Sequence, residues 1–187
     1  MKVLVGCEYS NTVSGAFRAA GHEAWSCDLL PSEGPAEWHY QGNVLDAIRR
    51  GWNLIILHPP CTALCVAGNR HYSGTPERAD AIRWTRSLWG LAKIYADRVA
   101  LENPVGVLSS NWRPPDQYIQ PWQFGHGETK KTGLWLHNLP ALEPTNIVEG
   151  REQRIWKMPP HPDRPKERSR FYPGIAQAMV KQWSDDV

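Results

Sequence analysis

Short runs of apolar residues recur along the chain and predict strands. Near-continuous apolar runs of four to six residues are typical of strands covered on both faces, as in parallel sheets. We place strands at residues 1–6, 23–29, 53–57, 99–102 and 133–137, and the end of one more at residues 42–46.

Amphipathic stretches separate these runs and predict helices. The longest helix, at residues 76–98, begins with Thr75 as cap residue and a proline at its first position. Shorter helices are expected up to Ala20, at residues 46–50 and at residues 173–183. Strands that alternate with helices predict an α/β fold with a mostly parallel, doubly wound sheet and right-handed crossovers.

The length and composition of the chain indicate a single globular domain. The 187 residues are 41% apolar and 21% charged, which suits a single domain over residues 1–187. No apolar run approaches the ~20 residues that span a bilayer, so we expect no membrane contact, and the immediate first strand leaves no room for a signal peptide. The four cysteines follow no regular disulfide framework, which favours a reducing cytoplasm.

Charge is nearly balanced overall, at +2, but it is unevenly distributed. Residues 151–170 contain seven Lys or Arg against three Asp or Glu. A phosphate-binding strip and a solvated loop explain this excess equally well. Residues 158–165 hold four prolines, which predicts irregular structure there.

Two short motifs follow predicted strands and carry the candidate chemistry. His58-Pro59-Pro60-Cys61 ends the run at residues 53–57, and Glu102-Asn103-Pro104 ends the run at residues 99–102. The carboxyl ends of parallel strands share the edge where open α/β sheets bind ligands. A thiol and a carboxyl group at one edge suit attack on an electron-poor ring, with the thiolate adding and the acid holding a ring nitrogen protonated.

This pair of motifs resembles those of the cytosine-5 DNA methyltransferases. In that family a Pro-Cys motif supplies the nucleophile for cytosine C6, and a Glu-Asn motif protonates or hydrogen-bonds N3. The resemblance covers most of the chain in motif order and is greatest to compact members of bacteriophages. It implies a Rossmann-like methyltransferase fold, S-adenosylmethionine as cofactor, DNA as partner, no separate target-recognition domain, and a bacterial or phage-infected cell.

The resemblance also implies a cofactor site beside the first strand. An acid at the end of the second strand commonly holds ribose hydroxyls, and Asp28 has that place. The first turn has one glycine where the family has several, and Asn43 stands where the family carries an acid, with Asp46 as the alternative. Glu8 serves equally to satisfy the amides of its own turn. The implied cofactor contacts are Gly6, Glu8, Tyr9, Ser10, Asp28, Leu29, Asn43, Val44, Pro59 and Ile175.

On the catalytic side the resemblance extends loosely to residues 128–132. There Lys130 stands for the first arginine of a Gln-x-Arg-x-Arg segment, which makes it the third implied catalytic residue beside Cys61 and Glu102. Residues 67–75 are polar and read either as a loop that closes over substrate or as a plain connection. The expected substrate contacts are Pro60, Asn103, Arg70, His71 and Lys131, with Trp112 and Trp122 as candidate stacking surfaces.

Other functions remain open at this stage. His58-Pro59-Pro60-Cys61 also resembles the motif of amino-group methyltransferases, which modify N4 of cytosine or N6 of adenine. Since only about 80 residues follow Pro104, a C5-pyrimidine nucleotide-modifying enzyme and a non-catalytic DNA-binding relative are further alternatives. A zinc deaminase would need His-x-Glu and Cys-x-x-Cys, and this chain has neither spacing, so we expect no metal.

Overall fold

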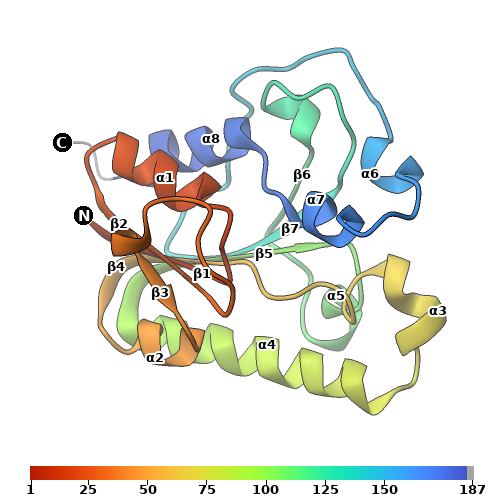
Figure 1. Cartoon of the computed structure of the whole chain (residues 1–187), viewed down its shortest axis with the longest axis horizontal. Helices are drawn as coiled ribbons and strands as arrows, with labels where there is room; N and C mark the ends of the chain where they lie inside the picture. The colour runs from red at the N-terminus through yellow and green to blue at the C-terminus, as the bar shows by residue number, and fades with distance from the viewer. Residues whose placement is uncertain (185–187) are drawn as a thin grey trace.

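The computed structural model describes residues 1–184, and within them seven strands form one sheet (Figure 1). The strands are β1 (Lys2–Gly6), β2 (Glu23–Asp28), β3 (His39–Gln41), β4 (Trp52–Leu57), β5 (Ala96–Pro104), β6 (Gln117–Ile119) and β7 (Thr132–His137). Their order is β3-β2-β1-β4-β5-β7-β6. The strands from β3 to β5 are parallel, and β7 is antiparallel to both of its neighbours. The predicted α/β class with a mostly parallel, doubly wound sheet is confirmed.

The direction in which the chain winds reverses beside β1. From β1 it moves outward through β2 to β3, and it then returns to place β4 on the other side of β1. Gly6 pairs with Leu57 at the carboxyl ends of these two strands. Such a reversal opens a crevice at that edge, which is where doubly wound sheets bind ligands.

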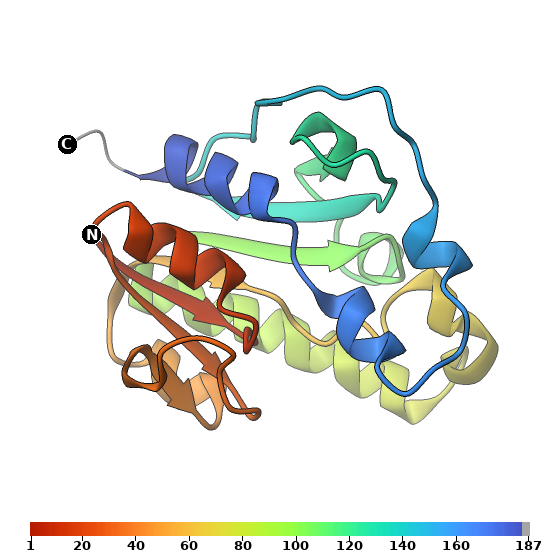
Figure 2. The ribbon, with the colours of Figure 1, turned by 45° about the horizontal axis from the view of Figure 1, so that its top comes forward.

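Helices cover both faces of the sheet (Figures 1 and 2). Helices α1 and α8 pack on one face with a core that includes Phe17 and Trp183, and α2 and α4 pack on the other with Ile48 and Leu88. No helix of the described part is long and apolar enough to cross a membrane. The helices are α1 (Thr12–Ala19), α2 (Val44–Ile48), α3 (Asn69–Tyr72), α4 (Pro76–Tyr95), α5 (Leu108–Asn111), α6 (Arg154–Lys157), α7 (Arg164–Ser169) and α8 (Pro173–Trp183), with 3-10 turns η1 (Ala36–Trp38), η2 (Val66–Gly68) and η3 (Pro121–Gln123).

Two boundaries near β5 differ from the sequence prediction. Helix α4 ends at Tyr95 and not at residue 98, and β5 runs from Ala96 to Pro104 instead of only from 99 to 102. The reason is pairing with β4, which joins Trp52 to Ala96 and continues along the strand. Pairing with a neighbouring strand outweighs the local helical pattern.

The polar stretch at residues 67–75 forms short helical turns, and its closing over substrate stays a prediction. It contains η2 and α3, and the buried guanidinium of Arg78 donates to the Ala63 carbonyl at 2.7 Å and to Asn69 Oδ1 at 2.8 Å. These bonds tie the start of the stretch, and the turn before it, to α4.

Smaller differences concern the short elements. The second strand ends at Asp28, one residue early, and the helix expected at residues 46–50 is α2, which begins at Val44 with Asn43 as its cap. The proline-rich stretch is irregular only as far as Asp163, because α7 tolerates Pro165 in its first turn. Helix α8 has the predicted bounds.

Candidate active site

The His-Pro-Pro-Cys segment leaves β4 in a fixed path. The backbone N–H of His58 donates to the Gly6 carbonyl at 2.9 Å, and the side-chain amide of Asn103 donates to the Pro59 carbonyl at 3.0 Å. Asn103 is 1% exposed, so this bond is made in the protein interior. The segment is therefore held against β1 and β5 on either side.

Cys61 begins a tight turn that packs on the protein interior through Leu64. Its carbonyl accepts from the N–H groups of Leu64 and Cys65 at 2.9 and 2.8 Å, and Leu64 is fully buried. A Cβ on Gly106 would lie 2.0 Å from the Leu64 carbonyl oxygen, so only glycine allows this close approach. Packing of this kind holds the nucleophile candidate in one place.

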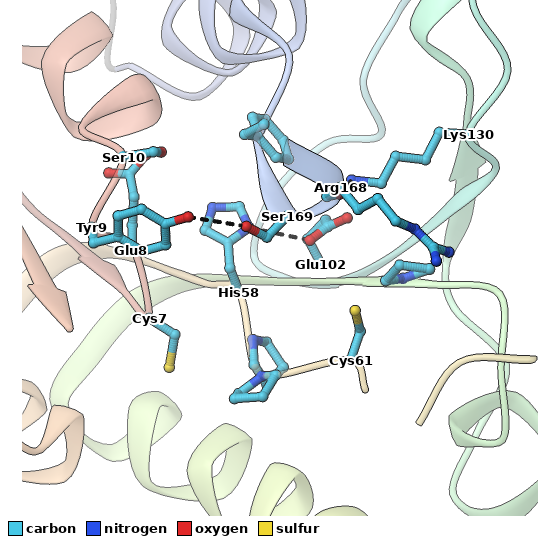
Figure 3. A pocket seen from close by; sticks show the side chains of 14 residues that line it. Cys7, Glu8, Tyr9, Ser10, His58, Cys61, Glu102, Lys130, Arg168 and Ser169 are labelled. Atoms are coloured by element: carbon cyan, nitrogen blue, oxygen red, sulfur yellow. Dashed lines mark hydrogen bonds and ion pairs between the residues drawn. The ribbon is translucent and has the colours of Figure 1, made fainter. Parts of the chain in front are cut away.

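Glu102 is a buried acid in contact with an imidazole. Its side chain is turned into the pocket beside His58, with 3.2 Å between Oε2 and His58 Nδ1 (Figure 3). Burial opposes ionisation, but the hydrogen bond and charge of His58, with help from Lys130 and Thr132, outweigh it and lower the pKa of Glu102. Glu102 is accordingly a carboxylate near neutral pH.

These side chains open on one pocket at the reversal between β1 and β4 (Figure 3). Cys61, Glu102, Lys130 and Arg168 lie at one end, and Tyr9 and the turn around it at the other. The cavity has a volume of about 110 Å³. Its lining consists of Cys7, Glu8, Tyr9, Ser10, His58, Pro59, Pro60, Cys61, Glu102, Pro104, Lys130, Arg168, Ser169 and Phe171.

The two neighbouring thiols, Cys61 and Cys65, titrate as a coupled pair. The hydrogen bond with Cys65, followed by burial and the charges of Cys65 and Glu102, raises the pKa of Cys61, and only Lys130 lowers it. The same hydrogen bond, with backbone N–H groups of Gly68 and Ala67, lowers the pKa of Cys65 to about 6 despite burial. The hydrogen bond between the two thiols thus favours the negative charge on Cys65 and the proton on Cys61.

The turn after β1 is built around Glu8, which is 4% exposed. Its carboxylate accepts from the N–H groups of Val13 and Ser14 at 2.6 and 3.1 Å and so caps α1. Cys7 has a φ of 60°, a left-handed conformation that favours glycine, and burial raises its pKa to about 12. Glu8 lines the pocket, yet its charge is already matched by helix amides.

The remaining predicted cofactor contacts are dispersed around the crevice. Tyr9, Ser10 and Pro59 line the pocket, whereas Gly6 packs directly against Val44. The other residues do not line it. Asp28 accepts from the Leu30 N–H at the end of β2, Leu29 is exposed, Asn43 accepts from the Leu45 N–H, and Val44 and Ile175 belong to the core. Their cofactor roles stay predictions.

The predicted substrate contacts are similarly divided. Pro60 lines the pocket and Asn103 lies buried beneath it, whereas Arg70, His71 and Lys131 are exposed and lie outside the lining. Lys131 instead lies 4.4 Å from the centre of the Tyr118 ring. Their substrate roles stay predictions too. Of the candidate stacking surfaces, Trp112 packs on Trp89 and Trp135, and Trp122 is covered by the Arg151 guanidinium at 3.9 Å.

One part of the lining was not anticipated from the sequence. Residues 164–171, which we call the strap, comprise α7 and the two residues after it and contribute Arg168, Ser169 and Phe171 to the lining of the pocket. The cationic excess of residues 151–170 was the available signal, but it gave no position relative to Cys61. His58 likewise gains a defined partner, Glu102, that its motif alone did not indicate.

Comparison with known proteins identifies solved structures that have a similar fold. Neither a protein-family model nor a curated protein matches the chain in sequence. Among solved structures, the Dnmt2 methyltransferase of S. pombe aligns with a TM-score of 0.50 and 13% identity over 84% of this chain and 53% of that chain. The chain has a methyltransferase fold. The sheet order of this methyltransferase fold, 3-2-1-4-5-7-6, agrees with the similarity, and the predicted fold is confirmed.

A second solved structure, described as a DNA modification methyltransferase encoded within a prophage (E. coli), aligns with a TM-score of 0.48 and 14% identity. That alignment covers 79% of this chain and 52% of the other. The chain thus spans about half the length of both solved structures that it resembles.

Proposed function

We propose that this chain transfers a methyl group from S-adenosylmethionine to C5 of cytosine in DNA. The observation that carries the proposal is the meeting of Cys61, Glu102 and Lys130 in one pocket at the reversal of a methyltransferase fold. The three side chains come from separate segments of the chain, and each suits one part of an attack on a pyrimidine ring. No other pocket described here combines a thiol, a buried acid and a lysine.

The residues in and beside the pocket have the chemical groups that a nucleoside cofactor needs. Asp28 ends β2, the place from which an acid reaches ribose hydroxyls, and Tyr9 and Ser10 line the near end of the pocket. Among the described residues His58 Nε2 is buried without a hydrogen-bond partner, so a polar group of a bound ligand would satisfy it. S-adenosylmethionine would supply an electrophilic methyl group in this crevice.

The chain's own residues account for the activation of the base. Cys61 adds through sulfur to cytosine C6, the Glu102 carboxylate accepts a hydrogen bond from N3 once the ring is protonated there, and Lys130 balances negative charge at O2. Because Cys61 begins with a raised pKa, it needs a proton acceptor, and Cys65 lies beside it with a pKa of about 6. After C5 has gained a methyl group, the C5 proton would pass to solvent water and the C6–S bond would break. The Cys61 thiolate that leaves would then take back the proton held by Cys65.

The amino-group alternative has less support. Enzymes of that kind use the first residue of the motif to hold the amine, a role that is open to His58 Nε2, which has no hydrogen-bond partner among the described residues. However, they place an aromatic ring where this chain has Cys61. A pocket that holds a thiol at that position suits addition to a ring carbon better than stacking on a base.

The direct test is incubation with tritiated-methyl S-adenosylmethionine and, separately, duplex DNA, single-stranded DNA and dCMP, followed by nucleoside mass spectrometry. We expect 5-methylcytosine from DNA with the wild-type chain and none with Cys61→Ala. N4-methylcytosine or N6-methyladenine would support the amino-group reaction instead, and label confined to dCMP would indicate a nucleotide enzyme. DNA binding without any label would leave a non-catalytic relative.

A further inference from the structure

The strap contacts residues at both ends of the pocket. Tyr9 Oη and Ser169 Oγ lie 3.2 Å apart, as Figure 3 shows, and Lys130 Nζ donates to the Arg168 carbonyl at 3.2 Å. The cavity that remains beneath, about 110 Å³, is well below the ~300–1,000 Å³ of ordinary ligand pockets. A cytosine nucleotide and a nucleoside cofactor need the strap to move.

One carboxylate, that of Glu33, pairs with two cations of the strap. Glu33 accepts from Lys166 Nζ at 2.7 Å and from Arg170 at 3.0 and 3.1 Å. The backbone N–H of Glu33 donates to the Tyr9 carbonyl at 2.8 Å, so this acid is tied to the near end of the pocket. These cations lower the pKa of Glu33, which keeps the latch charged down to acidic pH.

The latch is made of exposed charges that another anion can replace. About half of the surface of the Lys166 and Arg170 side chains is exposed, and exposed ion pairs contribute little individually. Two cations that converge on one carboxylate also match the geometry of a phosphate. Nearby, α6 carries Trp156, which is 76% exposed and lies between Arg154 and Lys157 in sequence. The surface thus combines cations with a free aromatic ring, as nucleic-acid-binding surfaces do.

We propose that the strap is a latch opened by DNA. Phosphates flanking the target cytosine take Lys166 and Arg170 from Glu33, and the strap then leaves the pocket mouth and uncovers Cys61. This inference rests on the proposed function and specifies its substrate. The latch cations lie outside the pocket lining, where flanking phosphates of a polymer reach them and the single phosphate of dCMP in the pocket does not.

The test compares Glu33→Gln with Glu37→Gln, which removes the same charge from an exposed acid of the same loop. Affinity for a fluorescein-labelled DNA duplex is measured by anisotropy without cofactor. Glu33→Gln should bind roughly fivefold tighter than both the wild type and Glu37→Gln, because two exposed ion pairs no longer oppose opening. In a Lys166→Gln, Arg170→Gln background the same change should have no effect, since the latch is already absent.

Hydrogen exchange supplies a second readout that does not depend on affinity. The amides of residues 164–171 should exchange faster in Glu33→Gln than in Glu37→Gln, and the wild type should show the increase when duplex is added but not when dCMP is added. Equal affinities of the two single variants, or a gain that persists in the Lys166→Gln, Arg170→Gln background, would overturn the latch. An increase with dCMP would overturn the polymer requirement. Neither readout uses methyl transfer, so 5-methylcytosine formed by a chain that fails these tests would leave the proposed function intact.

Discussion

The floor and the strap of the pocket are held by opposite kinds of interaction. The floor, residues 58–61 and 102–104, rests on buried contacts such as the Asn103 amide on the Pro59 carbonyl and the packing of Leu64 against Gly106. The strap rests on a hydroxyl pair, one lysine–carbonyl bond, exposed ion pairs to Glu33 and the contact of the Phe171 ring with the His58 ring, whose centres lie 4.8 Å apart. Buried bonds are costly to break, whereas exposed ion pairs are screened and worth little each.

This difference separates two tasks. A covalent mechanism needs its nucleophile and acid in one fixed geometry, which a densely packed floor provides. A base that comes from a polymer needs a covering that can be exchanged for the polymer itself. We therefore expect floor substitutions to change chemistry and stability strongly, and strap substitutions to change binding by small factors.

The largest effect should come from the nucleophile. Cys61→Ala should reduce 5-methylcytosine formation by several orders of magnitude, because no other described side chain of the pocket both is a thiol and faces Glu102. The measurement is nucleoside mass spectrometry, with cofactor affinity by calorimetry as the control that the fold is intact. An active Cys61→Ala chain would show that Cys61 is not the nucleophile.

The acid should come next. Glu102→Gln keeps the size of the side chain but removes the negative charge that would stabilise a proton on N3, so kcat should fall by about 10²–10⁴-fold. DNA affinity should change little, since Glu102 is 8% exposed and lies beneath the mouth. A variant that loses affinity and keeps kcat would indicate that Glu102 binds substrate without assisting chemistry.

Stability should distinguish the two regions directly. Leu64→Ala leaves a cavity beneath the Cys61 turn and should lower the free energy of unfolding by about 2–5 kcal/mol. Ser169→Ala in the strap removes two exposed hydroxyl contacts, to Tyr9 Oη and to the Lys166 carbonyl, and its effect should stay within about 0.5 kcal/mol. Denaturant melts of both variants make the comparison, and equal losses would contradict a replaceable strap.

The smallest effect is a shift in pH. Cys65 raises the pKa of Cys61, so Cys65→Ser should lower that pKa and move alkylation of Cys61 by iodoacetamide to lower pH. The same substitution at the other cysteine is the control. Cys61 lowers the pKa of Cys65, so Cys61→Ser should raise it and move alkylation of Cys65 to higher pH. Peptide mass spectrometry follows alkylation at both sites. If the pH of alkylation moved in the opposite direction at either site, the two thiols would not be coupled as described.

The elements that were predicted correctly depend on local signals. The apolar run before His58 and the proline that opens α8 are read from adjacent residues, and they gave the parallel sheet and the bounds of the last helix. The convergence of Cys61 and Glu102 followed from topology alone, since both leave parallel strands that prove to be neighbours.

The elements that were missed depend on partners distant in sequence. Nothing near Lys166 indicates that Glu33 holds it, and nothing near Ala96 indicates pairing with Trp52. The three-residue strand β6 is stabilised by β7 and carries too short a pattern to detect. The strap illustrates the general case, because its charge was visible and its place over Cys61 was not.

The most direct test of the account is covalent trapping. A DNA duplex that contains 5-fluorocytosine blocks release of the base, because fluorine at C5 cannot leave as a proton does. With S-adenosylmethionine present, we expect a denaturation-stable adduct that peptide mass spectrometry locates on Cys61, and none with Cys61→Ala. An adduct on Cys65, or methylated DNA without any adduct, would contradict the assignment of Cys61 as the nucleophile.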